Sequence, residues 1–147
     1  DENYILPIGK ACKVIEAEEK HEKSGESLVI ITYGRGVYWS LEASKSFAGK
    51  IEILDLRTLS PLDEDQILKS VKKHGKSLIV TEEPSSASFS LGIAGFIQEN
   101  CFEFLDAPVK IIGSENTPAI PLNENLEFTY LPNASKVQKA ISTLLEY

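Results

Sequence analysis

Short apolar runs alternate along this sequence with longer segments in which apolar residues recur every three to four positions. Short runs are typical of buried strands, whereas the longer period is typical of helices that pack on one face. The runs lie at 27–33, 51–56, 77–81 and 109–112, and the helical patterns at 37–48, 63–75, 89–105 and 133–145. Strands that alternate with helices through short connections predict an α/β domain with a mostly parallel sheet and helices on both faces.

The stretch 51–75 combines a strand, a turn and a helix. Pro61 bends the chain after the strand, because proline fixes φ and excludes the residue before it from the helical region. Asp63 is a good N-cap with Gln66 three residues on, which predicts a capping box. Cationic residues 72–74 followed by Gly75 predict the helix end, and we place His74 in that cap.

Residues 1–26 differ in pattern from the rest of the chain. Residues 4–17 carry strand-like residues, and the alternation at 13–17 predicts a half-buried edge strand. Residues 18–26 are almost wholly charged, which favours a solvated hairpin tip that includes His21. We therefore expect one domain over 1–147, with an edge strand and charged hairpin at 1–26 and an α/β core at 27–147.

Charge and composition exclude some functions. The net charge of −7 argues against a nucleic-acid binder. No apolar run approaches the roughly 20 residues of a membrane span. Cys12 and Cys101 are far apart without metal-site spacing, so we expect free thiols and a reducing compartment. Because the chain contains no methionine and starts at Asp1, we expect a fragment or a processed product.

Ligands of open α/β sheets bind at the loops beyond the carboxyl ends of the strands. Residues 34–36 form a G-x-G loop between a strand and a helix, but Trp39 occupies the third position of the dinucleotide fingerprint, so nucleotide binding there is weakly supported. Neither His21 nor His74 lies in such a loop, so a hydrolase triad has no convincing base.

Charged residues at two strand ends are candidates for loop or interface contacts. Glu82 and Glu83 are adjacent, so they point to opposite sides of an extended chain and do not form a catalytic dyad. We expect one to be solvated and the other to serve a turn or an interface. Arg57 could pair bidentately with a carboxylate of a neighbouring loop or subunit. The residues alone therefore predict an α/β domain without an evident active site.

Several short motifs point to one family. The sequence DLRTLSPLD at 55–63 is the most specific, and others follow the same order as in the family: IGKA at 8–11, TYG at 32–34, VTEE at 80–83, LDAPV at 105–109 and TP at 117–118. Together they resemble the C-terminal domain of the β subunit of thiamine-diphosphate-dependent 2-oxoacid dehydrogenases of the pyruvate and branched-chain type.

The resemblance implies a transketolase C-terminal-like fold, with three α/β/α layers around a mixed five-stranded sheet. It also implies that thiamine diphosphate and magnesium bind between upstream domains of the intact enzyme, which decarboxylates a 2-oxoacid and acylates a lipoyl group. This chain would then bind no cofactor, carry no catalytic residue and be inactive alone.

The implied role is assembly and docking. The expected partners are the upstream domains of the same enzyme, the α subunit or portion, a second β copy and the peripheral-subunit-binding domain of the dihydrolipoyl acyltransferase. Interface candidates are Arg57, Glu82, Glu83, Glu146 and Tyr147. The compartment would be the bacterial cytoplasm, or the mitochondrial matrix in a eukaryote.

The sequence departs from the family at three places. Thr81 stands where some relatives have a histidine, and the charged insertion from Glu18 to Ser24 is longer than the usual hairpin. Residues 119–122 lack the usual P-Y-A sequence, so contacts made there can differ. The competing hypothesis from the residues is a stand-alone ligand-binding or regulatory domain that uses the loops at Gly34 and Glu82.

Overall fold

The computed structural model describes residue 5 and residues 7–147, so the strand-like positions Tyr4 and Leu6 lie outside the described residues. The elements run in the following order: β1 (Cys12–Ile15), α1 (Glu19–Lys23), β2 (Leu28–Thr32), α2 (Gly36–Ser44), β3 (Ile51–Asp55), α3 (Glu64–His74), β4 (Ser77–Pro84), α4 (Phe89–Cys101), the 3-10 turn η1 (Phe102–Phe104), β5 (Lys110–Ser114), α5 (Glu124–Tyr130) and α6 (Ala134–Leu145).

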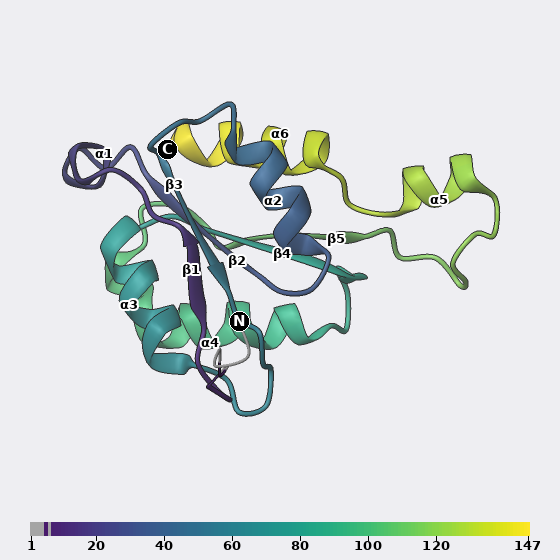
Figure 1. Cartoon of the computed structure of the whole chain (residues 1–147), viewed down its shortest axis with the longest axis horizontal. Coiled ribbons are helices and arrows are strands. Elements are labelled where there is room, and N and C mark those ends of the chain that lie inside the picture. The colour runs from purple at the N-terminus through teal and green to yellow at the C-terminus, as the bar shows by residue number, and fades with distance from the viewer. Residues whose placement is uncertain (1–4, 6) are drawn as a thin grey trace.

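The five strands form one sheet in the order β1-β3-β2-β4-β5. Strands β2 to β5 are parallel, and β1 pairs with β3 in the antiparallel direction. Helices α2 and α6 cover one face, and α3 and α4 cover the other (Figure 1). The predicted mixed α/β/α architecture is confirmed.

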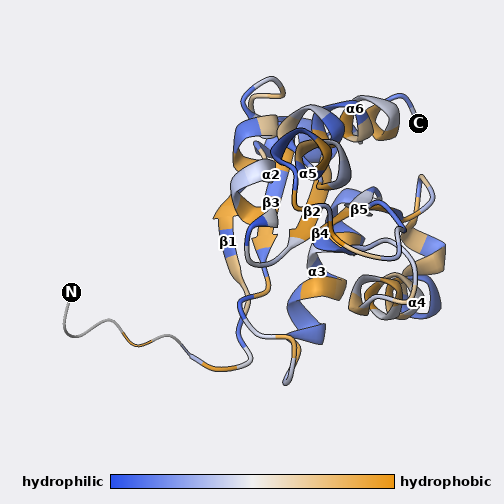
Figure 2. Ribbon diagram, turned by 90° about the vertical axis from the view of Figure 1, so that its right-hand side faces the viewer, coloured by the Kyte–Doolittle hydropathy of each residue, from blue (hydrophilic) through white to orange (hydrophobic). Residues whose placement is uncertain are grey.

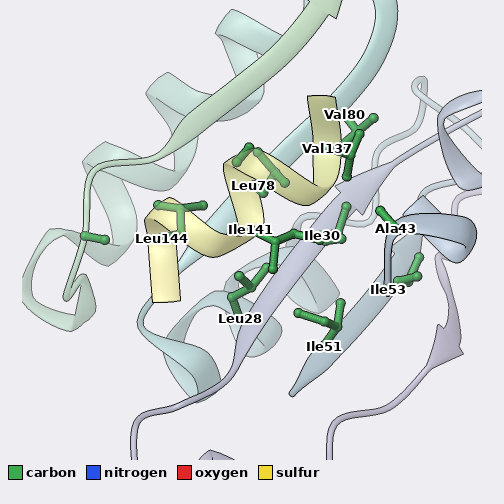
Figure 3. Packing of buried hydrophobic residues seen from close by; sticks show 12 residues of the cluster. Leu28, Ile30, Ala43, Ile51, Ile53, Leu78, Val80, Val137, Ile141 and Leu144 are labelled. Carbon is green, nitrogen blue, oxygen red and sulfur yellow. The ribbon is translucent and has the colours of Figure 1, made fainter. Parts of the chain in front are cut away.

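The sheet separates two apolar cores, because successive residues of a strand point to opposite faces. Ile30 and Ile53 pack with α2 and α6, a contact shown at close range in Figure 3. Ile31 and Leu54 pack on the other side with α3 and α4. All five residues of β2 are buried, which is why its sequence lacks the polar alternation of a solvent-facing strand.

Helix α3 begins and ends where the sequence predicts. The Asp63 carboxylate accepts a hydrogen bond from the Gln66 backbone N–H at 3.4 Å, and Gly75 closes the helix in the left-handed conformation with φ 68°. The Gln66 side chain donates to Ser70 and does not complete the capping box.

The predicted charged hairpin is wrong. Strand β1 pairs with β3, so that Cys12 lies opposite Asp55, and β2 lies on the other side of β3. Residues 18–26 therefore cross from one strand to another instead of turning back, and they contain the short helix α1. His21 is half-buried there, with its Nδ1 3.2 Å from the Glu26 carboxylate.

Residues 115–132, which we call the arm, leave the sheet after β5 and return at α6. The sequence patterns predict no helix between 113 and 132, and within the arm the structure adds the short helix α5. Asn123 begins α5 by accepting hydrogen bonds from the N–H groups of Asn125 and Leu126. Figure 1 shows the arm extending away from the body of the domain, beyond the ends of β4 and β5.

Candidate functional site

The carboxyl ends of β2 and β4 carry a hydrogen-bonded group of Tyr33, Thr81 and Glu83. The Tyr33 hydroxyl donates to Glu83 Oε1 at 2.6 Å and accepts from the Thr81 hydroxyl at 2.9 Å. Burial, followed by the bond to Glu83, raises the pKa of Tyr33 to about 12. The phenol is therefore held in its neutral form and serves as a fixed donor.

The other oxygen of Glu83 connects this group to α4. Glu83 Oε2 accepts from the backbone N–H of Phe89, the first residue of the helix, at 2.8 Å. A carboxylate there satisfies an N–H group that has no partner within the helix. Glu82 is exposed and lies 4.0 Å from Arg35. The pair thus has one solvated and one structural glutamate, and the arrangement does not favour general acid–base chemistry.

The glycine-rich loop is shaped for close packing between α2 and the sheet. A Cβ atom at Gly36 would lie 2.8 Å from the Val80 carbonyl oxygen and would collide with the Thr32 hydroxyl, which donates to that carbonyl. Trp39, which occupies the fingerprint's third position, is half-buried under the guanidinium of Arg35, 5.5 Å from the ring centroid. The close approach at Gly36 is therefore used for packing of the helix on the strands.

The loop after β3, residues 57–63, holds residues 9–11 by hydrogen bonds. Arg57 has a positive φ of 58°, uncommon for a residue with a side chain, and its N–H donates to Asp55 Oδ1 at 3.0 Å. The Thr58 hydroxyl accepts from the Gly9 N–H at 3.0 Å and donates to the Pro61 carbonyl. The peptide bond before Pro61 is cis.

Asp63 makes the second half of this attachment. It is buried, and while one oxygen caps α3, the other accepts from the Ala11 N–H at 3.0 Å. Lys10 adds a cation 3.5 Å from the same carboxylate. Loop 57–63 therefore holds residues 9–11 against the start of α3, which gives the most specific motif of the sequence a structural task.

The structure also contains a buried charged cluster that the sequence patterns did not reveal. Glu52, in the middle of an apolar strand run, has no exposed surface. Its carboxylate lies 3.1 Å from the Lys13 ammonium and 3.3 Å from His74 Nε2, with the Lys73 ammonium at 3.8 Å. Ser70 donates a hydrogen bond to the other oxygen. The sequence did contain one indication of this cluster: Glu52 is the only acidic residue in the interior of the apolar run 51–54, and lysines occur at 13 and 73.

Charges around Glu52 keep it ionised. Burial by itself would raise the pKa, but the contacts with His74, Ser70 and Lys13 outweigh it and lower the pKa of Glu52 to about 2. The cluster joins β1, β3 and α3, and Lys73 extends it to α1 through Glu22 at 2.6 Å. His74, predicted as a simple helix-end cation, thus lies at the centre of a network that ties four elements.

The same cluster contains a serine, a histidine and a carboxylate in series. The Ser27 hydroxyl lies 2.8 Å from His74 Nδ1, and Glu52 is on the opposite ring nitrogen. Ser27 has no exposed surface, so no substrate carbonyl can reach its oxygen. The arrangement is a structural network and does not support hydrolysis.

The interface residues predicted from the sequence do not converge. Arg57 follows β3 and Glu82 and Glu83 end β4, so these three share one end of the sheet with β2 between them. Glu146 lines a surface cavity with Phe47 and Lys50, beside the start of β3. Tyr147 is two-thirds exposed in the same terminal segment. Their roles as contacts stay predictions.

No group of three histidine, cysteine, aspartate or glutamate side chains suited to a metal ion occurs in the part of the chain that the structure describes. Cys12 and Cys101 are free, as predicted. None of the described helices combines the length and the apolar character that a membrane crossing requires.

The sequence matches the family described as Transketolase, C-terminal domain, over residues 16–137. A 2-oxoisovalerate dehydrogenase subunit beta from Bacillus subtilis (strain 168) is 35% identical over 149 residues, which cover 99% of this chain and 43% of that protein. A pyruvate dehydrogenase E1 component subunit beta from Rhizobium meliloti (strain 1021) is 30% identical, covering 97% of this chain and 30% of that protein.

A solved structure described as "Split gene transketolase, inactive beta4 tetramer" superposes with a TM-score of 0.77 at 18% identity. It covers 99% of this chain and 44% of its own, so this likeness concerns the fold. The chain spans less than half the length of each of these relatives. The matches confirm the resemblance that the short motifs indicated.

Proposed function

Because the chain belongs to the transketolase C-terminal domain family, we propose that it is the subunit-assembly and docking domain of a 2-oxoacid dehydrogenase. Its curated relatives include subunit beta of a 2-oxoisovalerate dehydrogenase and of a pyruvate dehydrogenase E1 component. In this proposal, the intact enzyme uses thiamine diphosphate and magnesium to decarboxylate a 2-oxoacid, and it passes the acyl group to a lipoyl arm.

The observation that carries the proposal is the attachment of residues 9–11 to loop 57–63. The Thr58 and Asp63 side chains accept backbone N–H groups from Gly9 and Ala11, across 49 and 52 residues of sequence. In this proposal, the family's most specific motif would fix how an upstream domain joins this one through residues 9–11. Such a role suits a domain that positions other parts of an enzyme and supplies no reacting group.

In this assignment, the cofactor lies in the upstream domains, and this chain by itself is inactive. The upstream domains of the same enzyme, the α subunit or portion and a second β copy are its partners within the enzyme. The site of action would be the cytoplasm of a bacterium or the mitochondrial matrix of a eukaryote.

The docking partner that we propose is the peripheral-subunit-binding domain of the acyltransferase. The chain carries a net charge of −7, and its last two residues add an exposed carboxylate and an exposed phenol beside the C-terminus. A basic partner would be attracted electrostatically, so its affinity should fall as the salt concentration rises. Titration calorimetry with that domain at several salt concentrations tests this, and an affinity independent of salt would contradict it.

Thermal unfolding with added ligands separates this role from that of a stand-alone ligand-binding domain. We expect the melting temperature of the chain to be unchanged by thiamine diphosphate with Mg²⁺, by a nucleotide or by a 2-oxoacid, since a ligand that binds the native state would raise it. A clear rise with any of these would favour ligand binding at the Gly34 and Glu82 loops. Trp39, close to that site, provides an independent fluorescence signal.

A further inference from the structure

A cavity of about 340 Å³ lies between the start of α2 and the second half of the arm. Helix α5 is on the same side of the sheet as α2 and α6 in both ribbon views (Figures 1 and 2). The lining combines charged and apolar side chains and includes Arg35, Trp39, Glu124, Glu127, Phe128 and Leu131. A concave site with apolar walls and a few polar groups is the usual form of a small-molecule site.

Both walls of this cavity are held in place by the rest of the domain. On the arm side, Tyr130 and Leu131 are buried, and the Glu115 N–H donates to the Tyr130 carbonyl at 3.1 Å. The Lys136 ammonium of α6 donates to the Leu131 carbonyl, also at 3.1 Å. On the other side, Trp39 packs against the core beneath α2 and α6. A ligand would therefore enter a preformed site, which lowers the entropic cost of binding.

The cavity carries opposite charges that do not pair with each other. An ion pair with Glu82, at 4.0 Å, is the only one that Arg35 forms with a described residue. Among those residues, no cation is within ion-pair distance of the carboxylate of Glu124 or of the half-buried Glu127. The guanidinium and the two carboxylates thus line one space without neutralising each other, so a ligand that carries both charges would satisfy both.

Apolar side chains supply much of the remaining lining. Leu131 is buried, Trp39 is half-buried, and Phe128 is 68% exposed although it lines the cavity. The Arg35 guanidinium lies over the Trp39 ring, 5.5 Å from its centroid, which places the cation beside apolar surface. An apolar group bound there would remove the exposed phenyl ring of Phe128 from water, which favours a ligand with an apolar part.

We propose that this cavity binds a free α-amino acid with an apolar side chain. The carboxylate of the ligand would pair with Arg35, whose planar guanidinium can bond both oxygens at once. Its ammonium would pair with Glu124 and Glu127, and its side chain would pack on Trp39 and Phe128. The volume is at the lower end of the range for ligand sites, which suits a single amino acid better than a dinucleotide. This inference goes beyond the proposed assembly role and does not depend on it.

Titration of the chain with L-leucine tests the site. Trp39 is the sole tryptophan, so its fluorescence reports on the cavity, and calorimetry measures the affinity. We expect saturable binding with a Kd of about 1 mM or lower. L-Leucinamide, which lacks the carboxylate, and 4-methylpentanoate, which lacks the ammonium, should each bind at least about tenfold more weakly. Glycine, which lacks the apolar side chain, should also bind at least about tenfold more weakly.

Substitutions assign each charge of the ligand to its side of the cavity, with calorimetry as the measurement. Arg35→Gln should remove the preference for L-leucine over L-leucinamide, because the carboxylate then has no guanidinium to meet. Glu124→Gln with Glu127→Gln should instead remove the preference for L-leucine over 4-methylpentanoate. A general loss of structure would not separate the ligands in this way. Glu99→Gln is the matched control, since Glu99 is an exposed carboxylate on α4, across the sheet, and it should bind L-leucine as the wild type does.

The absence of a saturable signal with L-leucine up to about 10 mM would overturn the proposal. Equal affinities of the wild type for L-leucine and L-leucinamide would also overturn it, as would an L-leucine affinity that is unchanged when both glutamates are replaced. These outcomes differ from failure of the proposed function, which is measured by binding to the peripheral-subunit-binding domain and by the screen with thiamine diphosphate, a nucleotide and a 2-oxoacid.

Discussion

Glu52 and Glu83 are carboxylates at opposite ends of the same sheet, and they are stabilised by different partners. Glu52 has no exposed surface and is surrounded by two lysines and a histidine. Glu83 is half-buried and accepts from a phenol and a backbone N–H. A charge without access to water requires cations close by, whereas a partly hydrated one is satisfied by neutral donors.

The pKa values of the two clusters shift in opposite directions for this reason. The cations hold the pKa of Glu52 at about 2, so the carboxylate stays ionised. At the other end, burial and the neighbouring carboxylate raise the pKa of Tyr33 to about 12, so the phenol stays neutral. Glu52 and Tyr33 each keep one protonation state through the physiological range, as expected for structural groups.

The largest expected effect is that of removing the buried charge. Glu52→Gln leaves the buried end of Lys13 without a carboxylate and leaves Lys73 with Glu22 alone, so the free energy of unfolding should fall by about 3 kcal/mol. Urea unfolding measures it. Glu82→Gln, an exposed carboxylate at the other end of the sheet, should change it by less than about 0.5 kcal/mol. Equal effects of the two substitutions would contradict the comparison.

Lowering the pH should remove the contribution of ionised Glu52 to the free energy of unfolding. The pKa of Glu52 is lowered from 4.5 to about 2, so its stabilisation is complete above pH 4.5 and is lost as the pH falls toward 2. The difference in unfolding free energy between wild type and Glu52→Gln should therefore shrink by roughly 3 kcal/mol over that range. Unfolding curves measured at several pH values test this, and a difference that does not depend on pH would exclude the ionised network.

Close packing at the carboxyl ends gives a smaller expected effect. In Gly36→Ala the added methyl group would lie 2.8 Å from the Val80 carbonyl and against the Thr32 hydroxyl. This overpacking should cost about 2 kcal/mol of stability. Gly95→Ala is the control, since its added Cβ meets nothing within 4 Å in α4. Alanine is the better helix former, so this change should raise stability by about 0.5 kcal/mol. Thermal unfolding of both variants shows whether their effects have opposite signs.

The smallest expected effect concerns the neutral cluster. Tyr33→Phe removes the hydroxyl between Glu83 and Thr81 and should cost about 1 kcal/mol. Because the pKa of Tyr33 is raised, its contribution is complete below pH 10 and is lost as the pH rises toward 12. Ultraviolet titration should show a phenol that ionises near pH 12 in the wild type and is missing from Tyr33→Phe. Loss of a phenol that ionises at the ordinary pKa of tyrosine in that variant would contradict the structure.

Periodicity predicted the parts of the fold that depend on local patterns. The strands, the N-cap at Asp63 and the helix end at Gly75 follow from the spacing of apolar residues and from backbone preferences. Helix α5 was not predicted, because it has only seven residues and its apolar residues Leu126 and Phe128 are exposed, so they form no packing face that a pattern could indicate. The partner of β1 was also mispredicted, since the choice between β2 and β3 is made by long-range pairing.

The contacts of loop 57–63 and of the Glu52 cluster were harder to predict, because they too join residues that are far apart in the sequence. The motif at 55–63 could be recognised in the sequence, but its attachment to Gly9 and Ala11 depends on contacts between residues 49 and 52 positions apart. Glu52 was concealed in an apolar run, and its partners come from β1 and α3. Each of these residues can be noted in the sequence, but the order of the strands in the sheet determines which of them are in contact.

The position of Glu52 also determines the alignment of the strands. A strand with apolar residues on both faces, such as β2, loses little when it slides by one residue, because apolar groups face both cores before and after. The same slip in β3 would turn Glu52 from Ser70 and His74 into the core beneath α2 and α6, where it would face the apolar side chains shown in Figure 3. One buried charge thus selects a single register for a sheet whose apolar residues alone would tolerate two.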